Sequence, residues 1–259
     1  MHERLRARPV TGHGDVEAFF DACAPEYAER HGDPGRLLRY RLSLLRAGAG
    51  LRPGDALLEI GCGDGLHLLA LAGELERGIG VDLSPAMIEA ARRRLRGSPA
   101  AWRDKVSFEV DAAERLATVA DESVDVAICL GALEHVLDQG AALRSAFRVL
   151  RPGGRLVCLT LNGGSLWYRR LAPALGLEMR RLSTDRFLSR RELARLLHAA
   201  GFGGLQLGHW TFVQRGDMPP LFAALLQGLD GIGRLLRLGA LRGGLRARAV
   251  KPRSRGEKS

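Results

Sequence analysis

The stretch Ala56-Leu-Leu-Glu-Ile-Gly-Cys-Gly-Asp-Gly-Leu-His-Leu-Leu-Ala-Leu-Ala72 contains the signals that decide the fold. Its apolar start, residues 56–60, predicts a buried strand, and the leucines after residue 65 predict a helix. Between them stand three glycines at alternate positions, Gly61, Gly63 and Gly65. Glycines permit a tight turn and a close approach of backbone to ligand, while the helix start offers unpaired N–H groups. We therefore expect a ligand site where this strand passes into the helix.

The glycine spacing narrows the class of ligand. A dinucleotide-binding turn has the pattern Gly-x-Gly-x-x-Gly, which would require glycine at position 66, where Leu66 stands. From Glu59 to Gly65 the chain instead reads Glu-x-Gly-x-Gly-x-Gly. The spacing thus argues against a nicotinamide or flavin dinucleotide.

Composition indicates one globular domain. The 259 residues suffice for a substantial core, and their longest apolar runs are too short or too interrupted for a transmembrane helix. The N-terminus lacks the apolar run of a signal peptide, and the four cysteines (Cys23, Cys62, Cys129 and Cys158) have no Cys-x-x-Cys spacing. We expect reduced thiols and a cytoplasmic location.

The positive charge is concentrated at the C-terminal end. From Arg234 onward there are nine Lys or Arg residues and one Glu, so this segment carries +8 of the net charge of +10. The remaining body is nearly balanced, which argues against a general nucleic-acid groove.

The segments that follow predict a doubly wound α/β sheet. A second strand ends in Asp82, 17 residues after Gly65, and Ser84 and Pro85 then begin a helix. Strands are also expected over 106–110, 124–130 and 151–160, with a helix over 140–150. Because parallel strands bind ligands at their carboxyl edge, Asp82 is placed to accept hydrogen bonds from both ribose hydroxyls of an adenosine.

Five ordered segments resemble one family. They are residues 59–65, Asp82, Asp111-Ala112, residues 130–135 and residues 150–154. Together they resemble class I S-adenosylmethionine (SAM) methyltransferases, in the small-molecule group that includes the ubiquinone and menaquinone pathway enzymes. The resemblance implies SAM as cofactor, with Asp111 near the adenine amino group and the Ala112 N–H near a ring nitrogen. The cofactor-binding residues that it implies are Glu59, Gly61, Cys62, Gly63, Gly65, Asp82, Leu83, Met87, Asp111, Ala112, Leu130 and Gly131.

The regions outside this core are expected to serve the substrate. Residues 1–50 are predicted to form an arm, frayed over 1–14, followed by a helical cover. Asp15 is expected to cap the first helix of this cover. Tyr27 and Tyr40 either face the cofactor or pack within the cover. Residues 51–162 form the SAM-binding core. Residues 163–251 carry lid segments, a helix capped by Ser189, and strands over 205–213 and 245–251, the last of them reversed. Residues 252–259 are expected to be a disordered basic tail.

His135 is the candidate catalytic base, because it follows the fourth strand at the cofactor edge, and Glu134 is expected to orient it or to cap the next helix. Quinone-pathway O-methyltransferases have a Glu-x-x-Glu-His pattern here that can hold a divalent ion. In this chain Gly131 replaces the first glutamate, which leaves two ligands, so we predict no metal site.

Methyl transfer to a small, hydrophobic oxygen or carbon acceptor is therefore the favoured function. The alternatives are a non-catalytic SAM-binding protein and, less favoured, an RNA or DNA methyltransferase, which would need a base-clamping Asn/Asp-Pro-Pro-Tyr/Phe stretch after the fourth strand. The helix expected over 218–238 has an apolar face (Leu221, Leu225, Leu229, Ile232 and Leu236) followed by arginines. We expect one of three roles for this helix: it covers an apolar pocket, it rests on an anionic membrane surface, or it packs as a core helix. The sequence determines neither the acceptor nor the oligomeric state.

Overall fold

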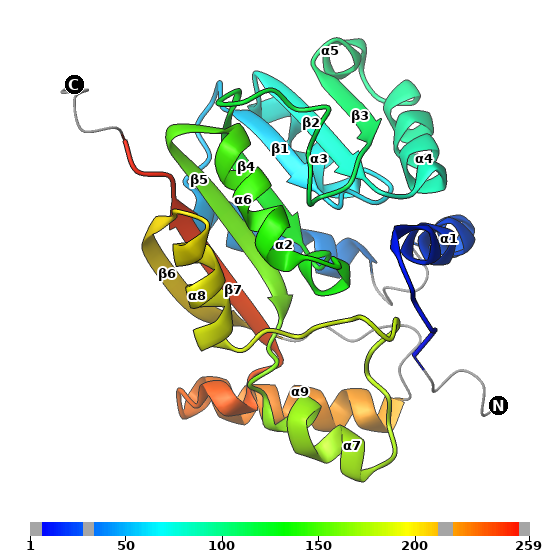
Figure 1. Cartoon of the computed structure of the whole chain (residues 1–259), viewed down its shortest axis with the longest axis vertical. Helices are drawn as coiled ribbons and strands as arrows, with labels where there is room; N and C mark the ends of the chain where they lie inside the picture. The colour runs from blue at the N-terminus through cyan, green and yellow to red at the C-terminus, as the bar shows by residue number, and fades with distance from the viewer. Residues whose placement is uncertain (1–6, 28–33, 212–219, 254–259) are drawn as a thin grey trace.

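A seven-stranded sheet in the order β3-β2-β1-β4-β5-β7-β6 organises the protein (Figure 1). The structure is a computed structural model that describes residues 7–27, 34–211 and 220–253. Neighbouring strands are parallel except at β7, which runs antiparallel to both β5 and β6. The doubly wound sheet with a reversed last strand is thereby confirmed. The strands are β1 (Ala56–Ile60), β2 (Arg77–Asp82), β3 (Val106–Val110), β4 (Val124–Leu130), β5 (Leu150–Leu161), β6 (Gly203–Trp210) and β7 (Gly244–Val250).

Helices cover both faces of this sheet. One core packs α2, α3 and α4 against the strands, and a second packs α6 and α8 on the opposite face. Both cores consist mainly of aliphatic side chains, and the burial of apolar surface is the main stabilising contribution to the fold. The helices are α1 (His13–Cys23), α2 (Pro34–Ala49), α3 (Leu66–Leu71), α4 (Pro85–Arg96), α5 (Ala100–Arg103), α6 (Gln139–Val149), α7 (Ala172–Ala174), α8 (Arg190–Ala199) and α9 (Pro220–Leu235).

Side-chain caps begin α4 and α8 at the serines that the sequence predicts, whereas the cap of α6 was not predicted. Ser84 accepts a hydrogen bond from the Met87 N–H at the start of α4. Ser189 and Glu192 form a reciprocal capping box at the start of α8. Helix α6 is capped by Asp138, whose carboxylate accepts from the Ala141 N–H at 2.8 Å.

The N-terminal segment differs from its prediction. Residues 7–14 are not frayed, because the Arg8 N–H donates to the Arg181 carbonyl and the Ser183 N–H donates to the Arg8 carbonyl, each at 2.8 Å. Helix α1 already begins at His13, and Asp15 is not its cap, since its carboxylate accepts from the Thr11 N–H and hydroxyl instead.

A small helical layer, which we call the cap, lies beyond the strand ends at the bottom of Figure 1. It consists of a π-helical turn η6 (Trp167–Leu171), α7 and α9, which share a core around Trp167, Ala172 and Leu226. The helix predicted over 218–238 corresponds to α9, which ends at Leu235, and residues 218–219 lie outside the described residues. The sixth strand ends at Trp210, and residues 212–213 of its predicted range also lie outside them, as do residues 254–259 of the predicted tail.

The glycine turn after β1 needs a left-handed backbone. Gly61, Gly63 and Gly65 have φ angles of +69°, +53° and +74°, a region that residues with a Cβ adopt only with strain. At Gly65 a Cβ would also lie 2.6 Å from Cζ of the buried Phe108 ring. The turn therefore requires glycine for its backbone conformation and for its packing.

Replacement of Gly65 tests that requirement. Gly65→Ala should lower the free energy of unfolding by about 2–4 kcal/mol, because left-handed strain and overpacking against Phe108 add together. Gly73→Ala is the matched control, since no atom lies within 4 Å of the new methyl group there and φ is ordinary, and it should change stability by less than about 0.5 kcal/mol. Urea unfolding measures both variants, and equal stabilities would contradict the argument.

Candidate active site

The glycine turn and the end of β2 form one side of a cleft at the carboxyl edge of the sheet. Asp82 accepts hydrogen bonds there from the Gly63 N–H at 2.8 Å and from the Ser84 N–H at 3.0 Å. Burial raises the pKa of the Asp82 carboxyl, and the nearby Glu59 carboxylate adds to the rise. The sheet thus holds a partly buried carboxylate at the position that sequence analysis assigned to an adenosine ribose.

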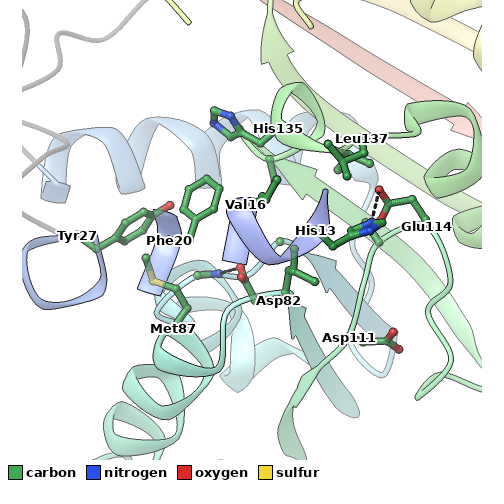
Figure 2. Close-up of a pocket in the computed structure, with 17 residues that line it drawn as sticks. His13, Val16, Phe20, Tyr27, Asp82, Met87, Asp111, Glu114, His135 and Leu137 are labelled. Atoms are coloured by element: carbon green, nitrogen blue, oxygen red, sulfur yellow. Dashed lines mark hydrogen bonds and ion pairs between the residues drawn. The ribbon is translucent and has the colours of Figure 1, made fainter. Parts of the chain in front are cut away.

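This cleft encloses about 670 Å³ of space, part of it open to solvent. Its lining combines backbone of the turn, the Asp82 carboxylate and apolar side chains of α1 and of the loop after β4 (Figure 2). Among the residues expected to bind the cofactor, those that line it are Gly61, Gly63, Asp82, Leu83, Met87, Asp111 and Gly131.

A second recess of about 470 Å³ lies on the other side of the turn and shares Tyr27 and Gly61 with the first. Cys62 and Leu130 line it, as do Arg41 of α2 and His67 of α3. Burial raises the pKa of the Tyr27 phenol, so its hydroxyl is protonated at neutral pH. The two hollows flank the glycine turn on both sides.

A polar chain runs behind this second recess. The buried Glu59 carboxylate lies 3.1 Å from Nδ1 of His67, whose Nε2 lies 3.3 Å from an Arg41 guanidinium nitrogen. With Nδ1–H donating to Glu59, Nε2 accepts from Arg41, so each group orients the next. Glu59 also accepts from the Leu68 N–H. Glu59 therefore positions a cation beside the glycine turn and lines neither hollow itself.

Three expected cofactor residues lie outside the two linings. Glu59 contacts His67 behind the second recess. Gly65 packs on the Phe108 ring, and Ala112 is buried at 2% exposure. Asp111 does line the cleft, but its carboxylate accepts from the Thr118 N–H and hydroxyl at 2.7 and 2.8 Å. In Figure 2 this carboxylate points away from Asp82.

Helix α1 lies across the mouth of the cleft. Its Asp21 accepts from the Ser84 hydroxyl at 2.5 Å and from the Ala86 N–H at 3.1 Å, which ties the helix to the start of α4. At the other side, His13 lies 3.1 Å from the Glu114 carboxylate, as Figure 2 shows. Val16 and Phe20 face the space between these contacts. The predicted helical cover is thus an apolar wall held by polar contacts.

His135 faces the same cleft from the loop after β4. Its Nδ1 lies 2.7 Å from an Asp185 carboxylate oxygen, and its ring packs edge-on against Phe20. Burial alone would raise the pKa of the Asp185 carboxyl. The hydrogen bond and charge of His135, together with hydrogen bonds from the Arg181 and Leu182 N–H groups, outweigh burial, so the pKa is lowered. With Nδ1–H donating a hydrogen bond to this carboxylate, Nε2 is the ring nitrogen that faces away from Asp185 and can accept a proton.

Glu134 does not take either role expected of it. Its carboxylate is buried at 2% exposure and accepts from the Thr160 hydroxyl at 2.8 Å. Asp185 orients His135, and Asp138 caps the next helix. Within residues 7–27, 34–211 and 220–253, no three His, Cys, Asp or Glu side chains gather to hold a metal ion.

Sequence reasoning missed Asp185, Arg41, His67, His13 and Glu114. Asp185 stands 50 positions from His135 in a stretch without a motif, so only the folded chain brings the two together. Tyr27 was expected in the cover and lines both hollows, whereas Tyr40 accepts a hydrogen bond from the Thr211 N–H.

The hollows suit an adenosyl sulfonium ligand. A Cβ on Gly63 would lie 3.1 Å from the Tyr27 ring, so only a glycine leaves the cradle between turn and cover open. On one side Asp82 presents a carboxylate suited to a ribose diol. On the other, Arg41 presents a cation suited to a carboxylate, and its guanidinium lies 2.9 Å from where a Cβ of Gly131 would stand. The donor set therefore fits SAM.

Comparison with known proteins agrees with this geometry. The family model described as a methyltransferase domain matches residues 58–158. A ubiquinone biosynthesis O-methyltransferase of Thiobacillus denitrificans is 31% identical over 166 residues, which cover 61% of this chain and 69% of the relative. An uncharacterised 37.1 kDa protein from a transposon of Streptomyces fradiae is 39% identical over 158 residues, 58% of this chain but only 44% of that protein.

A solved structure shares the fold over nearly the whole chain. Geranyl diphosphate C-methyltransferase from Streptomyces coelicolor, solved with Mg²⁺, geranyl diphosphate and S-adenosyl-L-homocysteine, superposes with a TM-score of 0.64 at 18% identity, covering 94% of this chain and 99% of that one. The sequence matches, the strand order and the cofactor cradle lead to one conclusion: the chain belongs to the class I SAM-dependent methyltransferases and resembles their ubiquinone-pathway members.

Proposed function

We propose that this protein transfers a methyl group from SAM to a small hydrophobic acceptor that carries an acidic O–H or C–H group. The observation that supports the proposal is the His135–Asp185 pair, an imidazole oriented by a carboxylate on the wall of the cleft that holds Asp82. A non-catalytic SAM-binding protein has no need of a base at this position.

The residues that hold the cofactor lie on both sides of the glycine turn. Asp82 accepts hydrogen bonds from the ribose hydroxyls, and Arg41 pairs with the carboxylate of the methionine part. When bound, SAM supplies a methyl group on a positively charged sulfur. The cover of α1 and the apolar loop after β4 limit the access of water to the cleft, so the polar contacts inside it act in a lower dielectric than bulk water provides.

His135 provides the proton transfer that such an acceptor needs. Nε2 takes the proton of the acceptor O–H or C–H as the acceptor attacks, while Asp185 accepts from Nδ1–H and stabilises the imidazolium that results. The ring is fixed by Asp185 on one side and by Phe20 on the other. Its orientation therefore does not depend on the acceptor.

The acceptor class follows from the remaining lining. Val16, Phe20, Val136 and Leu137 line the cleft near His135, and an apolar wall with few polar groups selects a hydrophobic ligand. The names of the relatives support the same class, since one acts in ubiquinone biosynthesis and the solved enzyme methylates carbon of geranyl diphosphate.

Asp82→Ala should weaken SAM binding roughly 10- to 30-fold, because two hydrogen bonds to the ribose are lost. In the wild type, affinity should also fall as the pH is lowered, and the fall should begin at a higher pH than an exposed aspartate would give, because burial raises the pKa of Asp82 and the protonated carboxyl accepts more weakly from the ribose. Isothermal titration calorimetry measures both effects.

Asp104→Ala is the control for this experiment, because Asp104 is an exposed aspartate at the end of α5. It should bind SAM like the wild type and keep the same pH dependence. Unchanged SAM affinity in Asp82→Ala, or tighter binding of NAD than of SAM by the wild type, would contradict the assignment of the cradle.

His135→Ala should lower turnover about 100-fold or more while SAM affinity stays within about twofold. Asp185→Asn should lower turnover less and shift the pH–rate profile, because the base remains but loses its charged partner. The readout is S-adenosylhomocysteine release, with an acceptor found by screening hydrophobic phenols, quinols and carbon acids.

His198→Ala, at an exposed histidine of α8, controls for loss of a surface imidazole and should leave turnover unchanged. Wild-type turnover in His135→Ala would show that the ring takes no proton. A protein that binds SAM but methylates no acceptor in the screen would favour the non-catalytic alternative.

A further inference from the structure

Helix α9 turns an apolar face to solvent. Positions 221, 225, 232 and 235 follow helical spacing along one side of it, and no charged residue stands among them. The exposed fractions are high for leucine and isoleucine: Leu221 68%, Leu225 47%, Ile232 49% and Leu235 82%, continued after the helix by Leu236 58% and Leu238 49%. Directly after α7, Leu175 is 53% exposed. An apolar stripe of this length marks an interaction surface.

The opposite face of α9 fixes this orientation. Ala223 and Leu226 are fully buried against the cap core. Asp230 is also fully buried, and it accepts hydrogen bonds from Nε of Arg242 and from the Gly243 N–H, each at 3.1 Å. A rotation that buried the leucines would expose the cap core and break this ion pair. The apolar face is therefore held outward by the rest of the structure.

Every exposed charge of the described cap segments 163–177 and 220–242 is positive. The cap segments 163–177 and 220–242 contain one acidic residue, and it is the buried Asp230. Four exposed arginines accompany the leucines: Arg169 and Arg170 on η6, and Arg234 and Arg237 at the end of α9. An exposed apolar stripe with basic flanks and no exposed carboxylate suits the headgroup region of an anionic membrane.

We propose that the cap docks on the surface of an anionic lipid bilayer, with α9 lying in the plane of the interface. Among the described residues no helix has the length and apolar content to cross a membrane, so the contact is peripheral. The cap lies beyond the strand ends that carry the site (Figure 1). Delivery of a hydrophobic acceptor from the bilayer into the cleft rests on the proposed function, whereas docking itself does not.

A second copy of the chain fits this face less well. Apolar stripes of two copies could cover each other, but pairing would hold the exposed arginines of both caps at one interface, and the described cap segments have no exposed carboxylate to neutralise them. Like charges held at an interface oppose association. A bilayer containing anionic lipids satisfies the apolar and the basic groups together.

Sedimentation with vesicles tests the proposal without SAM or acceptor. The full chain should sediment with vesicles that contain phosphatidylglycerol and stay in solution with pure phosphatidylcholine. Arg234→Glu with Arg237→Glu should lower partitioning roughly 30-fold or more, and Leu225→Gln with Ile232→Gln should lower it at least tenfold. The control, Arg191→Glu with Arg195→Glu, makes the same charge change on exposed residues of α8 and should retain most of the binding.

Circular dichroism and SAM calorimetry should show all three variants folded and unaltered at the cofactor site. A wild-type protein that stays in the supernatant with both kinds of vesicle overturns the docking proposal, as does equal loss of binding in the α8 control. So does a wild-type dimer that the Leu225/Ile232 variant converts to monomer, because the face then belongs to a self-interface. None of these results bears on methyl transfer, which the turnover of the His135 variants tests separately.

Discussion

The left-handed backbone of the glycine turn is the constraint on which the rest of the site depends. Strand β1 reaches α3 through Gly61, Gly63 and Gly65, all at positive φ. That path lets the Gly63 N–H donate to Asp82 at the end of the neighbouring strand. It also leaves room for Tyr27 and Ala132 to approach the turn closely. A side chain at Gly63 would enter the cradle beside Tyr27, and one at Gly61 or Gly65 would collide with Ala132 or Phe108.

Polar contacts between distant segments then enclose that space. Asp21 joins α1 to α4, His13 meets Glu114, and Asp185 reaches His135 from the segment that pairs with residue 8. These contacts tie the cover and the 181–185 segment to the sheet edge, so the cleft becomes a protected site only in the complete fold. Protection matters because hydrogen bonds and charges act more strongly where water is excluded.

The cap extends the fold in a different manner. Its inner face is fixed by Trp167, Leu226 and the Asp230–Arg242 pair, and these contacts leave leucines on the outside. A buried ion pair contributes little net stability but specifies one orientation strongly, since removing either partner leaves an unpaired buried charge. In the proposed arrangement the sheet edge serves the cofactor, and the cap brings the site to the hydrophobic phase that holds the acceptor.

Sequence alone determined the sheet, its reversed last strand and most of the cofactor cradle, because these follow from local signals. These signals are apolar runs, glycines at turns that require them, and a carboxylate at a strand end. Each of them acts on neighbouring residues in the chain. The partner of His135, the cation beside the glycine turn and the outward face of α9 depended on the tertiary structure. Glu134 precedes His135 in sequence, yet its carboxylate accepts a hydrogen bond from the Thr160 hydroxyl, and Asp185 orients the His135 ring. Local periodicity identifies an apolar helix face but cannot say which side the core will bury, since that depends on packing against residues far away in the chain.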